Sequence, residues 1–444
     1  MVEIEFFGGV GVIGGSKVSV STEHSRVMFD CGSDLPLAAD LFAPPVLPRP
    51  GRELADLVAV GQTRWIPGLF DPAHSDPRAE SRDPRAESRG PRAAPVDDRE
   101  LGVFVSHAHV DHDGLLGFLR QGLVVHASPE TVRLEQALAA SGKAPTGRPV
   151  DWQSVPYGDV VTVGDITVEF IPVDHDVPGA SALLVTTPQG RIAYTGDLNL
   201  HRDGGLRTRA FAERVAGVDV LLSETTGLSF DEERPLAGED EILGRFLEVC
   251  GRPGLQLVSL YERDIDRAQR WITAAADLGR RIVWPSAMAT TLAGYGVSDV
   301  VTWVDHRQAS AHLDLATITL DEVRAAPASY VVQLASTDPA QLLDLPVTAS
   351  TVWVHSQGEP LGPFMSDWAP FQAWLDHAGI ETVQAGSSGH ATGADLQQLV
   401  NDIAPGVVFP FHGFKPERLV GPRRTVLPAY GVRYRLDGAE IGPA

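Results

Sequence analysis

With 444 residues, the chain is longer than one typical hydrophobic core supports, so its length predicts two or three lobes. The 58 acidic and 36 basic side chains give a net charge of -22, which predicts a surface that repels polyanions and confines any nucleic-acid contact to a local cleft. Two cysteines exclude a disulfide framework, and the acidic N-terminus and short apolar runs indicate neither an export signal nor a membrane span, so we expect a cytoplasmic protein.

The N-terminal glycines allow two interpretations. "GVGVIG" at Gly9 to Gly14 fits the spacing of a dinucleotide-binding turn, and Asp30 lies near the distance of a ribose-binding acid. The next residues, "SKVSVSTEHSRVMFDCG", alternate apolar and polar side chains, with Val18 and Val20 on one face. That alternation is typical of strands in a hairpin and not of a phosphate-binding helix. We therefore expect strands and no dinucleotide site.

Residues 71–95 differ in composition from their surroundings. The heptapeptide "DPRAESR" at Asp76 to Arg82 repeats at Asp83 to Arg89, and the segment holds no apolar side chain large enough to anchor it. Such a composition cannot bury enough apolar surface to fold. We expect a disordered surface loop, with RNA contact through its arginines as the alternative.

The remaining chain shows the pattern of an α/β protein. Short apolar runs such as "ITVEFIPV" and "RIAYTGD" alternate with helical stretches such as "SPETVRLEQALAASG". From about Phe230, "GEDEILGRFLEVC", "LQLVSL" and "RDIDRAQRWITAAADLGRR" predict a second lobe, and strands of the first kind resume with "TVWVHSQGE". We expect a first lobe made of residues 1–228 and 349–444, with residues 229–348 inserted as the second. Trp271 and Trp374 lie at apolar helical positions, which favours core packing over stacking on bases.

Metal-binding side chains are densest in "SHAHVDHDG", which follows the apolar strand "GVFVS". At their spacing, His107 and His109 can reach one ion, while Asp111 and His112 can turn toward a second ion beside it. Imidazole and carboxylate ligands without thiolate suit Zn²⁺, with Mn²⁺ or iron as alternatives. This pattern predicts a metal site, and the competing interpretation is a solvated polar loop.

Two metal sites require more ligands than these four residues, so later strands should end in histidine or aspartate. Three do: His175 in "PVDHDVPGAS", Asp197 in "YTGDLN" and His412 in "PFHGF". Ligands commonly lie at such strand ends. Each residue alone would be an ordinary loop residue, but together they complete the set.

The order of these motifs resembles the metallo-β-lactamase fold. The resemblance implies an α/β fold, an αββα sandwich with an inserted α/β lobe, and a centre of two divalent ions. One ion is expected on His107, His109 and His175, the other on Asp111, His112 and His412, with Asp197 bridging both.

Further motifs resemble the β-CASP nucleases, especially ribonuclease J. "VDVLLSETT" places Glu224 at a strand end, and "SSGHATGADLQQLV" places His390 before a helix, as in two motifs of that family. The likeness covers most of the chain outside residues 40–100. It includes no counterpart of the additional C-terminal domain of long ribonuclease J proteins, and "HGF" stands where "HGE" or "HTE" is more common. These departures leave a homo-oligomeric state and the substrate open.

The resemblance implies a metal-dependent hydrolase, a ribonuclease or phosphodiesterase that binds single-stranded RNA or DNA. In the expected mechanism a metal-bridging hydroxide, positioned by Asp111, attacks phosphorus in line. His390 would contact a phosphate oxygen or assist the leaving group. Glu224 would orient a histidine, and its alternative is a surface acid.

The segment "SSGHA" is a candidate for substrate binding. Ser387, Ser388 and Gly389, together with His390, are expected to bind phosphate, and a plain helix N-cap is the alternative for the serines. A different function uses the same metals: hydrolysis of a small ester, phosphoester or specialised metabolite in a cleft covered by the second lobe. A binding protein with a residual metal site is the third class, against which the complete ligand set argues.

Overall fold

The computed structural model describes residues 1–34, 40–42, 46–75, 97–231, 236–304, 315–363 and 365–441. Most of the segment predicted to be disordered, from residue 76 to residue 95, lies outside the described residues. The prediction is wrong for its first residues, because Pro72–His74 form a 3-10 helix in which the Asp71 side chain accepts a hydrogen bond from the Ala73 amide. In the described part of the chain, no helix is both long enough and apolar enough to span a bilayer.

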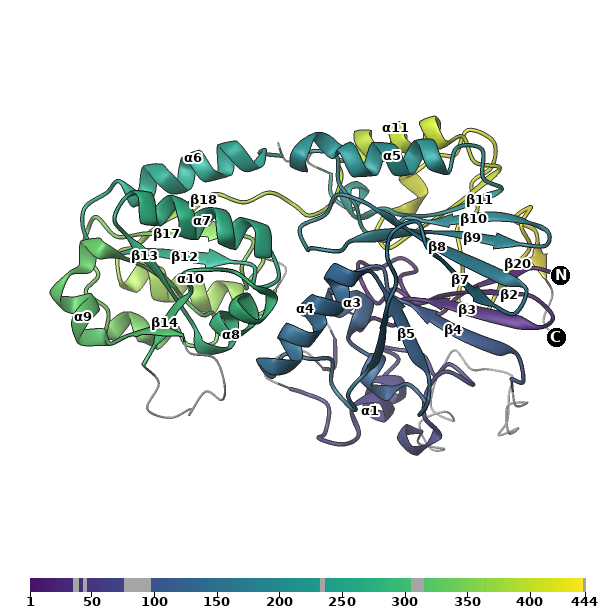
Figure 1. The fold of residues 1–444 in the computed structure, drawn as a ribbon, viewed down its shortest axis with the longest axis horizontal. Helices are drawn as coiled ribbons and strands as arrows, with labels where there is room; N and C mark the ends of the chain where they lie inside the picture. The colour runs from purple at the N-terminus through teal and green to yellow at the C-terminus, as the bar shows by residue number, and fades with distance from the viewer. Residues whose placement is uncertain are drawn as a thin grey trace.

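Two sheets face each other and form the predicted sandwich (Figure 1). The first has the order β21-β20-β1-β2-β3-β4-β5-β6, with the bounds β1 Glu3–Phe6, β2 Val18–Ser21, β3 Ser25–Phe29, β4 Glu100–Phe104, β5 Val124–Ala127, β6 Asp151–Ser154, β20 Arg433–Tyr434 and β21 Glu440–Ile441. The second has the order β19-β11-β10-β9-β8-β7, with the bounds β7 Val160–Val163, β8 Ile166–Pro172, β9 Ser181–Thr187, β10 Gly190–Tyr194, β11 Val220–Glu224 and β19 Val407–Phe411.

A core of buried apolar side chains fills the space between the two sheets. Phe6, Phe104, Phe170, Tyr194 and Phe409 belong to this core, and each comes from a strand whose inward positions are apolar. The predicted hairpin is confirmed, because β2 and β3 pair antiparallel. Burial of one apolar face per sheet is what joins the two layers.

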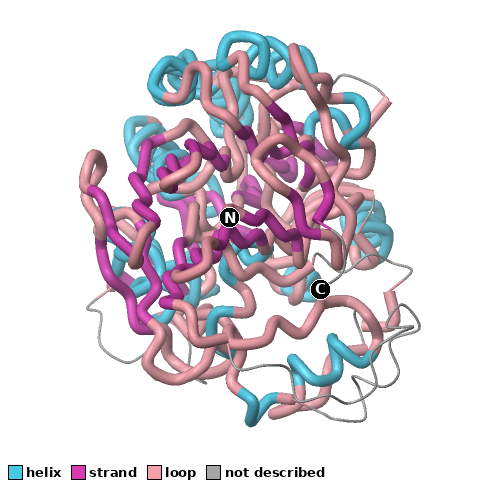
Figure 2. The backbone as a smooth tube through the Cα atoms, turned by 90° about the vertical axis from the view of Figure 1, so that its right-hand side faces the viewer, coloured by secondary structure: helices cyan, strands magenta, loops and turns pink. Residues whose placement is uncertain are grey.

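Helices cover the outer faces of the sandwich. The second sheet carries α5 (Leu206–Arg214) and α11 (Gly393–Ile403), while α1 (Glu53–Ala59), α3 (Val110–Asp113) and α4 (Pro129–Ala140) cover the first (Figure 1). Viewed onto the end that carries the N-terminus, strands run through the middle of the molecule and along its left edge, and helices lie above, below and to the right of them (Figure 2). The helix α4 begins as predicted, since Ser128 caps it by accepting a hydrogen bond from the Thr131 amide.

The inserted lobe is built on a third, parallel sheet of order β15-β14-β13-β16-β12-β17-β18. Its strands are β12 Gln256–Leu260, β13 Arg281–Trp284, β14 Val301–Trp303, β15 Ala316–Ile318, β16 Tyr330–Gln333, β17 Val352–Ser356 and β18 Glu381–Gln384. Its helices are α6 Glu239–Cys250, α7 Ile265–Asp277, α8 Ser286–Tyr295, α9 Leu320–Ala325 and α10 Trp368–His377.

The expected return to the first lobe at residue 349 needs correction. The strand β17 pairs with β12, and β18 pairs with β17, so this sheet continues to Gln384. The run "VWVHS" is buried at every position. A fully buried strand has no polar face, and its sequence pattern therefore does not show which sheet it joins.

Trp271 supports the inserted lobe and is not available for base stacking. Its side chain is 1% exposed, and its ring stacks on Phe246 with centroids 4.1 Å apart. We expect Trp271→Ala to lower the free energy of unfolding by about 3–5 kcal/mol in urea denaturation, because it empties a large buried volume. Replacing the exposed neighbour Arg270 by Ala should change it by no more than about 0.5 kcal/mol. An equally small effect of both substitutions would contradict the core assignment.

Candidate metal centre

The loop that carries the first histidines follows β4 and is fixed by backbone hydrogen bonds to the N-terminal strands. The amides of Ser16 and Cys31 donate to the carbonyls of Asp111 and His112, at 3.0 and 2.8 Å. From the other side, the carbonyl of Gly9 accepts from the His412 amide. The N-terminal residues around this glycine-rich turn therefore support the ligand loops through their backbone.

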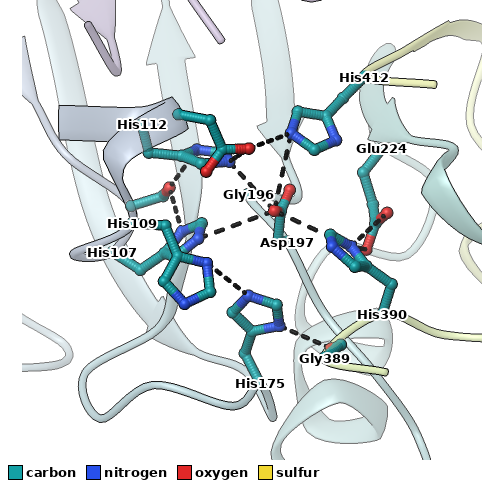
Figure 3. Close-up of polar contacts among 12 residues, drawn as sticks. His107, His109, His112, His175, Gly196, Asp197, Glu224, Gly389, His390 and His412 are labelled. Atoms are coloured by element: carbon teal, nitrogen blue, oxygen red, sulfur yellow. Dashed lines mark hydrogen bonds and ion pairs between the residues drawn. The ribbon is translucent and has the colours of Figure 1, made fainter. Parts of the chain in front are cut away.

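The structure brings all seven predicted metal ligands together. Potential ligand atoms lie within 4.8 Å of one another in two groups of four, the first containing His107, His109, His175 and Asp197, and the second Asp111, His112, Asp197 and His412, while Asp197 also forms a third group with Glu224 and His390. Asp197 lies between the groups, with its Oδ2 atom 3.1 Å from His112 Nε2 and 3.7 Å from both His107 Nε2 and His412 Nε2 (Figure 3). Every side chain in both groups is buried. This is the division of residues that the resemblance implies.

Each of the five histidines among the predicted metal ligands has one ring nitrogen in contact with a residue that is not itself a predicted ligand. The contacts are His107 Nδ1 to Ser106 Oγ at 2.9 Å, His109 Nε2 to Asp176 Oδ1 at 3.2 Å, His112 Nδ1 to Asp30 Oδ2 at 2.7 Å, His175 Nδ1 to the Gly389 carbonyl at 2.6 Å and His412 Nδ1 to Thr226 Oγ1 at 2.9 Å. Such partners fix the tautomer and ring orientation of metal-binding histidines. The other nitrogen of each ring is left facing the centre.

The inward atoms fit divalent cations. His107 Nε2 and Asp197 Oδ1 are buried without a hydrogen-bond partner, and His109 Nδ1 faces His175 Nε2 at 3.3 Å. Buried polar atoms without partners are costly, and a cation shared by imidazole and carboxylate ligands satisfies them. The donor set therefore suits a binuclear site.

The electrostatics of His107, His175 and Asp197 agree with this fit, whereas Asp197, Asp30 and Asp111 raise the pKa of His112 well above its usual value against the effect of burial, so this ring must release a proton to bind a cation. Burial lowers the pKa of His107 well below its usual value, and burial lowers the pKa of His175 to about 4, so both rings are neutral and able to bind a cation. Burial acts to raise the pKa of Asp197, but His112, His412 and His390 hold it well below its usual range. The carboxylate at the middle of the centre is therefore an anion.

His390 and Glu224 lie beside the two groups. His390 Nδ1 is 3.0 Å from Glu224 Oε2 and 3.9 Å from Asp197 Oδ2. The same Glu224 carboxylate accepts hydrogen bonds from the amides of Leu198 and Thr226. The interpretation of Glu224 as a surface acid is wrong, because it is fully buried at the end of β11.

The predicted phosphate-binding residues precede His390 in the loop between β18 and α11. Ser388 Oγ accepts a hydrogen bond from the His390 amide, and Ser387 Oγ is buried without a partner. The N-cap interpretation is wrong for both serines, because the cap of α11 is Thr392, whose side chain accepts from the Asp395 amide. The carbonyl of Gly389 accepts from His175 Nδ1, so this glycine also supports a predicted ligand.

Sequence reasoning missed the residues that hold the histidines from outside. Asp30 was considered only as a ribose-binding acid, yet its carboxylate contacts His112 Nδ1 and accepts hydrogen bonds from the Ser106 amide and the Tyr194 hydroxyl. Asp176 directly follows His175, and that adjacency was a usable signal. Nothing local to Thr226 indicates its contact with His412, since the two residues are far apart in sequence.

Comparison with known proteins agrees with this fold. A family model described as a β-lactamase superfamily domain matches residues 64–252. The chain has the metallo-β-lactamase fold. A crystal structure of a protein of unknown function from Enterococcus faecalis is 26% identical to it, with a TM-score of 0.81 over 97% of this chain and 99% of that one. The predicted sandwich with an inserted lobe is thereby confirmed.

The curated relatives are distant. Ribonuclease J from Thermus thermophilus is 26% identical over 368 residues, which are 75% of this chain and 63% of the relative. Ribonuclease J 2 from Streptococcus pyogenes is 24% identical over 343 residues, or 70% and 59%. Ribonuclease J from Pyrococcus abyssi is 24% identical over 207 residues, or 43% and 45%. The chain therefore covers less than two thirds of these relatives and is related to ribonuclease J at low identity.

Gly389 offers a test of the outer contacts. A Cβ atom there would lie 2.5 Å from Asp176 Oδ2, and Asp176 in turn lies against His109. We expect Gly389→Ala to weaken metal affinity roughly 10- to 100-fold, because it displaces partners of His109 and His175. The measurement is competitive zinc titration. Gly244→Ala is the control, since a Cβ in that helix meets nothing within 4 Å. Unchanged affinity in both variants would contradict a role for the Gly389 contacts.

Proposed function

We propose that the protein is a dinuclear metal-dependent nuclease that cleaves phosphodiesters of single-stranded RNA or DNA. The observation that carries the proposal is a histidine outside the two groups of four ligands but adjacent to them: His390, held by Glu224, lies 3.9 Å from Asp197. The relationship to proteins named ribonuclease J supports the same class of reaction. In this proposal the third sheet and its helices form a β-CASP-like lobe, and the reaction takes place in the cytoplasm.

Two divalent cations, Zn²⁺ or Mn²⁺, would hold the scissile phosphate, neutralise its charge and make water nucleophilic. His107, His109 and His175 would hold one, Asp111, His112 and His412 the other, and Asp197 both. Asp111 is placed to accept a proton from the attacking water, because its Oδ2 atom faces the centre 3.2 Å from His412 Nε2. The His112 and His412 rings hold the pKa of Asp111 below its usual value against the effect of burial, which keeps the carboxylate ionised.

His390 is the proposed donor on the substrate side. Burial acts to lower its pKa, but in the metal-free protein Glu224 and Asp197 raise it to about 10; Glu224, which holds no metal in this proposal, keeps favouring the protonated ring when the ions are bound. A charged imidazole can donate to a phosphate oxygen or to the leaving oxygen. Ser387, with its unpartnered hydroxyl, is the second proposed phosphate contact, and Ser388 and Gly389 shape this loop.

Hydrolysis of a small ester, phosphoester or specialised metabolite is the second candidate function. Three basic side chains near the ligand loops are paired with acidic side chains. This pairing reduces the positive charge available to a polyanion and favours a small substrate. Arg202 pairs with Asp264, and Lys415 and Arg418 both pair with Asp231.

Cleavage of 5′-monophosphorylated single-stranded RNA labelled at its 3′ end tests the proposal. Protein reconstituted with zinc or manganese should degrade this RNA, Asp111→Ala and His390→Ala should not, and the product ladder separates exonuclease from endonuclease action. The exposed His377, replaced by Ala, is the matched control. Intact RNA in the presence of protein that holds two metals would overturn the nuclease proposal and favour the small-substrate hydrolase.

A further inference from the structure

A short segment of the inserted lobe, residues 261–264, lies between the ligand loops of the proposed metal centre. It follows β12 and precedes α7. Its first residue, Tyr261, places its ring edge-on to the ring of His109, with centroids 5.3 Å apart. Arg263 and Asp264, which end the segment, are 3% and 1% exposed. We call residues 261–264 the clamp segment.

Arg263 contacts both arms of the loop that carries four predicted ligands. Its Nη1 atom donates to the carbonyl of Ala108, which stands between His107 and His109. The same nitrogen donates to Asp113 Oδ2 at 3.0 Å, and Asp113 directly follows His112. One buried guanidinium thus joins the start and the end of the loop.

Asp264 connects the clamp segment to the second ligand loop. Both of its carboxylate oxygens accept from Arg202 Nη2 at 2.9 Å, while Arg202 Nη1 donates to the carbonyl of His175 at 3.1 Å. Asp264 also caps α7 by accepting from the Arg267 amide. The start of a helix in the inserted lobe is therefore tied, through one arginine, to the backbone of a predicted ligand.

We infer that Arg263 is a positioning residue for the metal centre and that the inserted lobe forms a structural part of it. A planar guanidinium has donors in a fixed geometry and can hold two acceptors at once, which an ammonium group does less well. Both acceptors of Arg263 lie within one residue of predicted ligands, so its loss should relax the spacing of His107, His109 and His112. This inference rests on the proposed metal centre and adds that metal affinity depends on contact with the inserted lobe.

The test compares two buried arginines of the inserted lobe. Arg263→Met removes the contact with the ligand loop. Arg280→Met is the matched control, because Arg280 is 5% exposed and donates to the carbonyls of Gly254, Tyr330 and Arg252, all within its own lobe. Each full-length variant is loaded with Co²⁺ for its visible spectrum and titrated with Zn²⁺ against a chromophoric chelator. Thermal melts of the metal-free proteins measure the loss of stability.

We expect Arg263→Met to bind zinc roughly 10- to 100-fold more weakly and to show an altered cobalt spectrum. Arg280→Met should keep the affinity and spectrum of the wild-type protein, even where its melting temperature falls. Wild-type affinity and spectrum in Arg263→Met overturn the inference. If that variant does not fold, Arg263→Lys replaces it: the lysine keeps the charge but should give an intermediate loss of affinity, and unchanged affinity overturns the inference.

The same titrations separate this inference from the proposed function. Failure of the wild-type protein to bind two metals would contradict the proposed centre and therefore the inference with it. Normal binding by the wild-type protein and by Arg263→Met alike would contradict the inference alone.

Discussion

Asp197→Asn is expected to eliminate binding of two metals and, with it, hydrolysis. Asp197 is the residue shared by both groups of potential ligands and is 2% exposed. The substitution keeps the shape of the side chain but removes the anion that faces His107, His112 and His412 at 3.1 to 3.7 Å. Removing one partner of a buried charge cluster costs about 3–5 kcal/mol, so zinc affinity should fall roughly 10²- to 10³-fold or more.

The measurement is metal content after dialysis at fixed free zinc, together with the rate of RNA cleavage. Asp176→Asn is the matched control, because Asp176 is a half-buried carboxylate that touches His109 from the outside. Asp176→Asn should lower zinc affinity less, roughly 10- to 100-fold, as is typical when a hydrogen-bond partner of a metal ligand is replaced. Two tightly held metals in Asp197→Asn would show that this carboxylate does not bridge them.

His390→Ala is expected to lower the rate of cleavage roughly 10²- to 10⁴-fold while both metals remain bound. The ring belongs to neither of the two groups of four ligands, and its own group of potential ligands contains only Asp197 and Glu224 besides itself. Its partner Glu224 is fully buried, so the histidine is held in one orientation. The loss should therefore appear in kcat with metal content unchanged.

Glu224→Gln serves as a second variant. Glutamine can accept from His390 through its one oxygen but loses the negative charge that raises the pKa of this ring, and its NH2 group would face one of the two backbone amides that now donate to the carboxylate. Because the His390 ring remains, this variant should reduce the rate less than His390→Ala. The exposed His377→Ala should behave as the wild-type protein. Loss of metal from His390→Ala would mean that His390 is a ligand and not a donor to the substrate.

Much of the site could be predicted because its signals are local. His107, His109, Asp111 and His112 lie within six positions after an apolar strand, and such spacing indicates shared ions without knowledge of the fold. His175, Asp197 and His412 each end an apolar run, and ends of neighbouring strands meet at one edge of a sandwich. The hairpin at Val18 to Phe29 likewise followed from alternation alone.

Two features could not be predicted from the sequence: which sheet a buried strand joins, and which residues contact the predicted ligands from outside. The strand β17 was assigned to the wrong sheet because a strand buried on both faces carries no periodic signal. The contact of Thr226 with His412 depends on the parallel register of β11 and β19, which places Glu224 opposite Phe411. Register between strands so far apart in sequence is set by the packing of the whole sheet.

The sequence by itself determined which side chains of this protein are candidates for binding metal, in which order they occur, and that they lie on an α/β scaffold. Only the tertiary structure decided what holds those side chains in place, from Asp30 behind His112 to Gly389 behind His175 and Arg263 across the lobe boundary. The physical reason is that a ligand is recognised by its own functional group and its nearest neighbours. Its orientation depends on hydrogen bonds from segments that meet only when the sheets and the inserted lobe pack together.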